Sequence, residues 1–425
     1  MPDTPAPAAP RVLIVADNAS AMFGGEGILP LKYFTLLARR HRDVRLITHE
    51  RNREALLATF PDLAERMVFS RDTAAHRWLW RIGARFPGAI RDHLFGNVMG
   101  FVTGWQQRKL ARAVIRAQGA DLVHQPIPVS PAAPSLLHGL GAPVIIGPMN
   151  GGMNYPPGYE DYEGRASRMF IAVGRPMAGL INRLIPGKRR ARLLLVANQR
   201  TARALPVQHG RVAELVENGV DFDLWPGAGP RALNTGPFKL VFMGRLVALK
   251  GLSQTLDALA QARAQVPDRD ITLDILGDGS ELEALKAQAE RLGLSSAVRF
   301  RGFLPQTDCA QYLAQADALI LASLRECGGA VVLEAMAMGL PVIASDWGGP
   351  ADYLDDTCGI LVPPCPRADF IPALSAAIVL LARNPERARA LGAAGAVRAR
   401  AEFDWQRKID AMEDHYRSVA GGTTH

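Results

Sequence analysis

The sequence predicts an α/β protein made of two Rossmann-like domains, each built on a doubly wound parallel sheet. Short apolar runs such as RVLIVAD (11–17) and FKLVFMGR (238–245) are typical of strands that are buried on both faces. Amphipathic segments with helical spacing separate these runs, and this alternation is typical of parallel βαβ units. The chain of 425 residues is also long enough for two domains of this kind.

The first half of the chain opens with a Pro/Ala-rich tail over residues 1–10, which we expect to be disordered. The strand at 11–17 leads into a Gly-rich loop, and the segment 28–40 that follows has the spacing of an amphipathic helix. These elements begin an expected N-terminal domain over residues 11–215. Its further strands are expected at 43–50, 121–125 and 143–148.

The second half repeats this arrangement in an expected C-terminal domain over residues 216–403. The stretch 216–237 is rich in Gly, Pro and Asn and lacks a helical period, so it predicts the link between the domains. A last helix over about 404–421 follows the second sheet and could lie back on the first domain. Strands are expected at 238–245, 271–279, 298–304, 316–323 and 341–346, and helices at 252–265, 280–292, 306–315 and 330–338.

The net charge of +8 is distributed unevenly along the chain. Residues 1–210 contain 28 Lys and Arg against 14 Asp and Glu, whereas the remainder contains 21 against 27. A basic first half indicates contact with an anionic partner. No nucleic-acid recognition motif accompanies it, so a nucleic-acid partner is disfavoured.

The cysteines and the apolar stretches indicate in which cellular compartment the protein is expected. The four cysteines form no C-x-x-C pair and no histidine cluster has zinc spacing, which favours a reduced, cytoplasmic protein without a structural metal. The N-terminus lacks the apolar core of a signal peptide, and no apolar stretch reaches the roughly 20 residues that span a bilayer. We therefore expect neither a leader nor a transmembrane helix.

The segment ALILASLRECGGAVVLEAMAMGLPVIASDWGGP (318–350) carries the strongest functional signal. A strand ends at Ser323, a loop with Glu326 and two glycines follows, and a helix that starts near Ala330 carries Glu334. Bare backbone N–H groups at a helix N-terminus favour anionic or hydroxyl-rich ligands, and carboxylates accept hydrogen bonds from sugar hydroxyls. We favour ligand binding by both glutamates over the alternative of a surface loop charge and a helix N-terminal charge.

Arg245 and Lys250 lie at the end of the strand 238–245 and in the turn after it. Two cations at this place can neutralise a diphosphate leaving group. The alternative is a pair of surface cations, which we disfavour because the Glu326–Glu334 segment is present.

These segments together resemble the family-four retaining glycosyltransferases (glycosyl transferases group 1). Glu326 and Glu334 match the E-x7-E signature of that family, and Asp352 stands where the family usually has a glutamate. The similarity extends over essentially residues 11–420. It is carried by ENGVD (217–221), MGRLVALKG (243–251), LGDGSELEAL (276–285), FRGFLP (300–305) and GGPADYL (348–354).

The resemblance implies a GT-B fold, in which two Rossmann-like domains face a central cleft. It implies a retaining enzyme that moves a sugar from a UDP- or GDP-linked donor to an acceptor hydroxyl, with no metal or other cofactor. The implied catalytic residues are Glu326, Arg245, Lys250 and His124. The implied donor-binding residues are Gly24, Gly25, Arg245, Lys250, Gly277, Gly302, Phe303, Glu326, Cys327, Gly328, Gly329 and Glu334.

Three features of the first half carry weaker signals. His124 ends the strand 121–125, where a lone histidine is more often a satisfied core residue than a catalytic one. The loop GGEG (24–27) departs from the family's G-G-x-E, and QPIPVSP after His124 departs from its H-x-H. A further Gly-rich strand end places Asn150, Gly151 and Gly152 as candidate acceptor-side residues.

Aromatic and basic residues gather in the region 76–116, and a second basic cluster spans 186–192. One interpretation is a face that meets anionic lipid head groups and a lipid-linked acceptor, at the inner face of the cell membrane. The other is an ordinary helix pair with apolar residues in the core and solvated arginines outside. The basic first half tilts the choice toward the membrane.

The sequence thus favours a transferase of polysaccharide, glycolipid or cell-envelope glycan synthesis with a glycan or lipid-linked acceptor. A nucleotide-sugar epimerase of the same fold and a non-catalytic sugar-binding protein are the alternatives. An oxidoreductase is disfavoured because no G-x-G-x-x-G follows the strand at 11–17.

Overall fold

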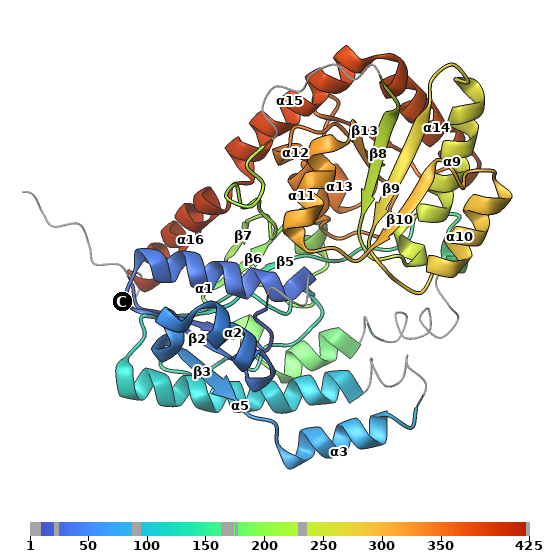
Figure 1. Cartoon of the computed structure of the whole chain (residues 1–425). Coiled ribbons are helices and arrows are strands. Elements are labelled where there is room, and N and C mark those ends of the chain that lie inside the picture. The colour runs from blue at the N-terminus through green and yellow to red at the C-terminus, as the bar shows by residue number, and fades with distance from the viewer. Residues whose placement is uncertain are drawn as a thin grey trace, which may run out of the picture. The chain divides into compact units, whose positions relative to one another are not determined.

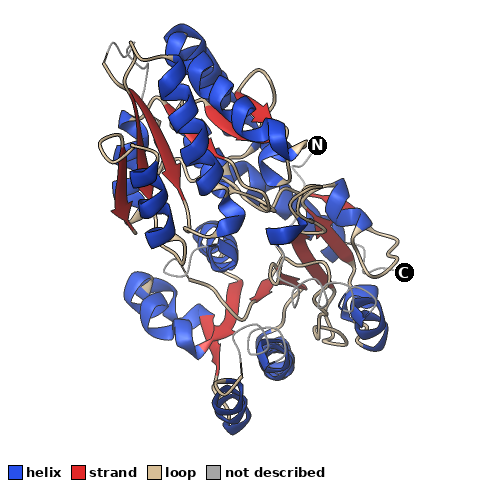
Figure 2. Cartoon of the chain, turned by 90° about the vertical axis from the view of Figure 1, so that its right-hand side faces the viewer, coloured by secondary structure: helices blue, strands red, loops and turns tan. Residues whose placement is uncertain are grey.

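The computed structural model describes residues 10–20, 25–86, 95–162, 174, 177–227 and 236–421. The chain forms two compact units (Figure 1). The first consists of Met1–Gly152, Arg165–Glu217 and Gln406–His425, and the second of Met153–Gly164 and Asn218–Trp405. In each unit the strands lie between helices (Figure 2). No helix in the described parts of the chain has the length and apolar character needed to cross a membrane.

The first unit is built on a seven-stranded sheet in the order β3-β2-β1-β4-β5-β6-β7, with every strand pair parallel. Its central strands are short and wholly apolar or nearly so, as expected for strands covered on both faces. The strands are β1 (Val12–Val15), β2 (Val44–His49), β3 (Met67–Ser70), β4 (Leu122–Gln125), β5 (Val144–Met149), β6 (Leu193–Val196) and β7 (Val212–Glu214). The helices are α1 (Ile28–Arg40), α2 (Arg53–Thr59), α3 (Ala74–Gly83), α5 (Gly96–Gln118), α7 (Gly187–Arg190), α8 (Gln199–Arg203) and α16 (Trp405–Ala420).

The second unit is built on a six-stranded parallel sheet in the order β10-β9-β8-β11-β12-β13. The chain winds outward from β8 to β10, then crosses back to β11 and winds the other way, so the switch point lies between β8 and β11. The strands are β8 (Phe238–Met243), β9 (Ile271–Leu276), β10 (Val298–Gly302), β11 (Ala318–Leu321), β12 (Val342–Ser345) and β13 (Gly359–Val362). The helices are α9 (Leu252–Gln265), α10 (Leu282–Arg291), α11 (Gln306–Gln315), α12 (Ala330–Ala337), α13 (Gly349–Tyr353), α14 (Arg367–Arg383) and α15 (Pro385–Glu402).

The expected elements are found close to their expected bounds. The helices predicted at 28–40, 252–265 and 306–315 are confirmed residue for residue. The strands β3, β6, β7 and β13 are additional. Three of them have only four residues and β7 has three, so each is too short to show a periodic pattern. The tail over 1–9 and residues 228–235 of the expected link lie outside the described residues.

One segment that we expected in the first domain belongs to the second unit. The described residues 153–162 follow β5, yet they pack on the second sheet's helices and loops. The indole Nε1 of Trp347 donates to the carbonyl of Asn154 at 2.9 Å, and the ring of Tyr159 lies 6.3 Å from that of Phe370. The sequence could not reveal this, because the partners are about 200 residues away along the chain.

The chain leaves the first unit after Glu217 and returns at Gln406. Its last helix, α16, packs on the first unit, where Arg40 of α1 pairs with Asp410 at 2.6 Å. Next to these two crossings, Val220 and Asp404 form a parallel bridge in the second unit. The chain therefore changes units here between Glu217 and Asn218 and between Trp405 and Gln406.

Candidate functional site

Four loops meet at the carboxyl ends of the strands in the second unit. They follow β8, β9, β10 and β11, around the switch point where ligands bind in open α/β sheets. Backbone hydrogen bonds join them: Leu246 N–H donates to Asp278 O at 2.9 Å, and Leu324 N–H to Leu249 O at 2.8 Å. Main-chain hydrogen bonds therefore hold these loops to one another, and these bonds do not depend on which side chains the loops carry.

Glycine permits this close approach. Gly277 and Gly251 both have positive φ, at 145° and 67°. A Cβ at Gly277 would overlap the carbonyl oxygen of Gly244, and one at Gly251 would overlap that of Ala322. No other residue fits at either position without moving a backbone.

Glu326 and Lys250 form an ion pair at the junction of the β8 and β11 loops. Only 13% of the Lys250 side chain and 15% of the Glu326 side chain are exposed. The pairing fixes the lysine ammonium in one place, and partial burial shields it from screening by water. The structure thus brings together two residues that lie 76 positions apart in the sequence and that the motifs had singled out separately.

Arg245 lies beside this pair in the sequence motif but is exposed, at the end of β8. Among the described residues its guanidinium has no hydrogen-bond or ion-pair partner. Lys250 is therefore a cation already held by a carboxylate, and Arg245 is a cation available to an anionic ligand.

Helix α12 begins directly after the Glu326 loop. Its N-cap is Gly329, and no side chain caps the helix. The first N–H groups are thus left for a ligand, and the helix dipole favours a negative one. Glu334 lies in the second turn of α12, where burial raises the pKa of its carboxyl to about 7. Hydrogen bonds from ligand hydroxyls would favour the ionised form of this carboxyl.

The remaining predicted donor-side residues line the same loops. Gly302 is bridged to Gly277, with the Gly277 N–H donating to the Gly302 carbonyl at 2.7 Å. Phe303, the next residue, is 78% exposed and offers a free aromatic face. Cys327 is partly buried and Gly328 is buried. Asp352, which replaces the family's glutamate, lies in α13.

His124 has a different environment from the one that a catalytic residue needs. Its side chain is fully buried at the end of β4. Nε2 donates to the carbonyl of Gly147 at 2.7 Å, so Nδ1 is the acceptor for the hydroxyl of Tyr416 at 2.8 Å. Burial lowers the pKa of the ring to about 4. Both ring nitrogens are used, which favours the core alternative, and a catalytic role for His124 stays a prediction.

The candidate acceptor-side residues are also tied into the first unit. Asn150 is buried, and its Nδ2 donates to Oε1 of Glu217 at 2.7 Å. The N–H of Gly151 donates to Oγ1 of Thr201 at 3.0 Å. These contacts secure the end of β5 and do not present the Asn150 amide to a ligand. Gly25 is exposed, whereas Gly24 lies outside the described residues.

Residues 229–398 match the family described as Glycosyl transferases group 1. The chain carries a domain of this family. The match covers all the loops of the site, from Arg245 and Lys250 to Glu326 and Glu334. The matched residues all belong to the second unit. They leave out its residues 153–164, 218–228 and 399–405. The matched stretch 229–398 is named the transferase domain.

Known relatives resemble part of the chain. Glycogen synthase of Mycobacterium tuberculosis is 33% identical over 49% of this chain and 49% of its own length. A D-inositol 3-phosphate glycosyltransferase of Segniliparus rotundus is 33% identical over 49% of this chain and 47% of its own. The chain therefore spans about half the length of the curated relatives that it matches.

Solved structures cover nearly the whole chain. The Anabaena protein HepE, crystallised with UDP and also with UDP-glucose, matches with a TM-score of 0.66 in its UDP complex, over 96% of this chain and 100% of its own. At 18% identity this likeness shows the fold alone. The GT-B fold expected from the sequence is confirmed.

One segment that contacts the transferase domain's site loops was not among the sequence-based predictions. The Arg325 guanidinium, next to Glu326, lies over the ring of Tyr155 at 5.6 Å. Met153 is buried, and a Cβ at Gly348 would overlap its side chain. The Tyr-rich run in YPPGYEDYEG (155–164) was the available signal, but nothing local shows which surface it covers.

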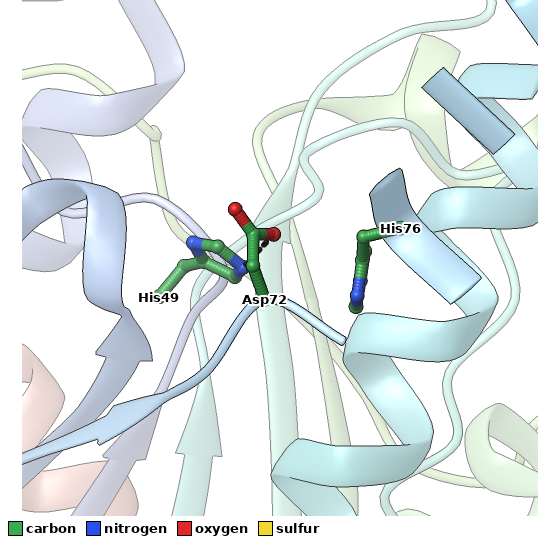
Figure 3. Close-up of side chains that lie close together, drawn as sticks. All are labelled: His49, Asp72 and His76. Carbon is green, nitrogen blue, oxygen red and sulfur yellow. Dashed lines mark ion pairs between the residues drawn. The ribbon is translucent and has the colours of Figure 1, made fainter. Parts of the chain in front are cut away.

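A second polar cluster lies in the first unit, outside the transferase domain. Figure 3 shows His49 at the end of β2 beside Asp72 and His76, which lie before and within the start of α3. One potential metal-ligand atom from each lies within 4.8 Å of the others, and His49 Nε2 lies 3.4 Å from Asp72 Oδ1. The cluster therefore has the ligand types and the spacing of a candidate metal site.

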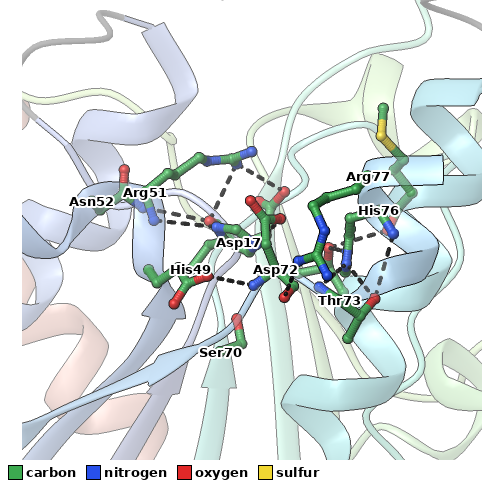
Figure 4. Close-up of polar contacts among 12 residues, drawn as sticks. Asp17, His49, Arg51, Asn52, Ser70, Asp72, Thr73, His76 and Arg77 are labelled. Carbon is green, nitrogen blue, oxygen red and sulfur yellow. Dashed lines mark hydrogen bonds and ion pairs between the residues drawn. The ribbon is translucent and has the colours of Figure 1, made fainter. Parts of the chain in front are cut away.

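The hydrogen bonds to the two rings argue against a metal ion. Nδ1 of His49 accepts from the N–H of Arg51 at 3.3 Å, and Nδ1 of His76 accepts from that of Thr73 at 3.1 Å (Figure 4). A neutral ring whose Nδ1 accepts carries its proton on Nε2. A metal bound at Nε2 would move that proton to Nδ1, against the backbone N–H. That the reaction needs no metal or other cofactor stays a prediction.

Proposed function

We propose that the protein is a retaining, metal-independent glycosyltransferase that uses a nucleotide-linked sugar, with UDP as the first nucleotide to test and GDP as the second. The observation that carries the proposal is the held Lys250–Glu326 pair beside an unpaired Arg245, at the switch point of the transferase domain. The UDP complexes of HepE support the choice of nucleotide.

In this proposal the cations serve the leaving group. The bond between the anomeric carbon and the diphosphate oxygen breaks, and negative charge develops on the diphosphate. Arg245, Lys250 and the N-terminus of α12 stabilise that charge, which fixed donors do more effectively than water does. Glu334 accepts hydrogen bonds from the ribose hydroxyls, and Glu326 orients Lys250 and accepts from the sugar. Phe303 offers its ring to the base.

The acceptor hydroxyl attacks the same face of the sugar from which the diphosphate departs, so the configuration is retained. A bond forms between the acceptor oxygen and the anomeric carbon, and the acceptor proton passes to the leaving diphosphate oxygen. His124 takes no part, because neither ring nitrogen is free. We propose a glycan or lipid-linked acceptor in polysaccharide, glycolipid or cell-envelope synthesis, on the cytoplasmic side of the cell membrane.

A donor screen tests this proposal. The purified chain is incubated with a panel of UDP- and GDP-sugars, and thermal shift and nucleotide release are both measured. We expect a shift with one nucleotide class and slow nucleotide release, and Arg245→Ala should lose both. The matched control is Lys286→Ala on α10, an exposed lysine paired only with its neighbour Glu283.

The outcomes separate the alternatives. Release of an epimerised free sugar would indicate an epimerase, and donor binding without turnover in the presence of acceptor extracts would indicate a sugar-binding protein. If no nucleotide shifts the melting temperature and Glu334→Ala behaves like the native chain, the transferase proposal fails.

A further inference from the structure

Two tryptophans of α3 are exposed. His76, Leu79 and Gly83 are buried on one side of this helix. Trp78 is 62% exposed and Trp80 is 67% exposed, and because they are two positions apart their side chains leave the helix on different flanks. Indole rings this large are ordinarily covered, and a group of them at a surface marks a site of interaction. Figure 1 shows α3 as an outer helix of the first unit, with α5 between it and the sheet.

Further aromatic side chains are exposed in the segments next to α3. Trp105 of α5 is 51% exposed, with the ammonium of Lys109 held 3.5 Å from its ring centroid. Phe86, just past the end of α3, is 44% exposed, and its ring lies 5.3 Å from that of Phe95. A further exposed apolar group in the first unit consists of Met177, Leu180 and Leu184.

The segments that carry these side chains contain cations and no acids. Residues 73–86 and 95–118 contain no Asp or Glu, although exposed Asp72 stands just before α3. Residues 177–192 likewise contain none. The cations in the first two ranges are Arg77, Arg81, Arg85, Arg108, Lys109, Arg112 and Arg116, and those in the third are Arg183, Lys188, Arg189, Arg190 and Arg192. Of these, Lys188 is buried, and its Nζ donates to the carbonyl of Pro131.

The face is held in place from below. Thr73 and His76 form a capping box at the start of α3, and Nε2 of His76 lies 3.0 Å from Oγ1 of Thr103 on α5. His49 and Asp72 join the end of β2 to the approach to α3 (Figure 4). The polar cluster that does not fit a metal thus fixes α3 to the body, so the exposed tryptophans belong to an anchored helix.

We infer that this face, defined by Trp78, Trp80, Phe86 and Trp105 with the cations around them, docks the protein on an anionic phospholipid bilayer. Tryptophan favours the zone between head groups and acyl chains, and long basic side chains reach anionic head groups while their stems lie along apolar surface. A nucleic acid would match the charge but would leave the apolar rings without an apolar partner. An acidic protein would need a complementary surface that nothing here indicates.

The inference rests on the proposed function for its purpose, since a lipid-linked acceptor would be met at a bilayer. It does not depend on the chemistry of the transferase site. Membrane docking and donor binding are therefore measured on the same preparation, and either can fail alone.

The experiment is co-sedimentation of the full chain with vesicles of phosphatidylcholine, with and without phosphatidylglycerol. We expect strong binding only to the anionic vesicles, weakened by 0.5 M salt because the attraction is screened (roughly 3–4 Å Debye length near that concentration). Tryptophan emission should shift to shorter wavelength on binding. The double variant Trp78→Ser/Trp80→Ser should lose about tenfold or more in partition coefficient.

A matched control replaces an exposed apolar side chain by serine on a helix of the other unit, Val397→Ser on α15, where Val397 is 72% exposed. It should bind vesicles like the native chain. Circular dichroism and the nucleotide thermal shift show that each variant is folded. Equal binding to neutral and anionic vesicles, no binding at all, or native-like binding by the tryptophan variant would overturn the inference. Loss of the nucleotide shift with vesicle binding intact would refute the proposed function alone.

Discussion

The two units share a parallel doubly wound sheet but use the same topological position differently. In the first sheet the switch point lies between β1 and β4, and in the second between β8 and β11. His124 at the end of β4 is covered by Tyr416 of the last helix and has both ring nitrogens bonded. Arg245 at the end of β8 is exposed, and Lys250 meets Glu326 across the junction of the two loops. At the switch point of the first unit the side chains are therefore buried and hydrogen-bonded to one another. At the switch point of the second unit an exposed cation remains for a ligand.

The two units also differ in how many large apolar side chains they expose. Among the described residues, nine large apolar side chains are strongly exposed in the first unit, and only Phe303 and Val397 are so exposed in the second. Phe303 belongs to the candidate donor site. The first unit therefore exposes more large apolar side chains than the second, as expected of a unit that meets an apolar partner.

Removing the held cation should have the largest effect. Lys250→Ala deletes the charge that the proposed function assigns to the developing diphosphate, and it leaves Glu326 without its partner. We expect nucleotide release to fall by about 10²–10³-fold, as for the loss of one preorganised donor. Steady-state release of the nucleotide measures it, with Lys286→Ala as the control. An unchanged rate would show that the second unit's switch point is as structural as the first's.

Acid should weaken the first unit through its buried histidine. The ring of His124 has its pKa lowered from 6.5 to about 4, chiefly by burial. Between these values the unfolded chain binds a proton that the folded chain does not, so stability falls as the pH drops from 6.5 toward 4 and is fully present above 6.5. The loss should be on the order of 3 kcal/mol.

Denaturant unfolding across this pH range measures that loss, and His124→Gln provides the comparison because it removes the titration. The native chain should show a steeper decline than the variant. Parallel curves for the two chains would show that His124 is not buried as the structure has it.

Breaking the cover over the first switch point should have a smaller effect. Tyr416→Phe removes the hydroxyl that donates to Nδ1 of His124 and leaves that nitrogen unsatisfied in the core. We expect the free energy of unfolding to fall by about 1–3 kcal/mol, with the nucleotide thermal shift retained. Loss of turnover without loss of stability would instead restore a catalytic role for His124.

The exposed tryptophans should matter least for the fold. Because Trp78 and Trp80 are mostly exposed, Trp78→Ser/Trp80→Ser should change the free energy of unfolding by no more than about 0.5 kcal/mol. Chemical denaturation in the absence of lipid checks this. A large destabilisation would mean that the rings are packed within the protein and do not form a docking face.

Much of the architecture was accessible from the sequence because the strands are buried on both faces. Runs such as VLIVA in 11–17 and ALILA in 316–323 are apolar without alternation, and this predicts parallel strands whatever surrounds them. The segment 153–164 was assigned to the wrong unit because its contacts with Trp347 and Phe370 are not local. The hydrogen bond from Tyr416 to His124 was out of reach for the same reason, since the two residues lie 292 positions apart.

By itself, the sequence determined the two-domain α/β plan, the position of the transferase domain and the residue types at its loops. Hydrophobic periodicity, glycine at tight turns and the sign of side-chain charge are local properties, so they can be read from the order and spacing of the residues. Only the tertiary structure decided which polar groups meet and which remain open. Lys250 pairs with Glu326, Tyr416 donates to the buried His124, and the tryptophans of α3 are exposed. Burial and pairing depend on elements far apart in the chain, which no local pattern encodes.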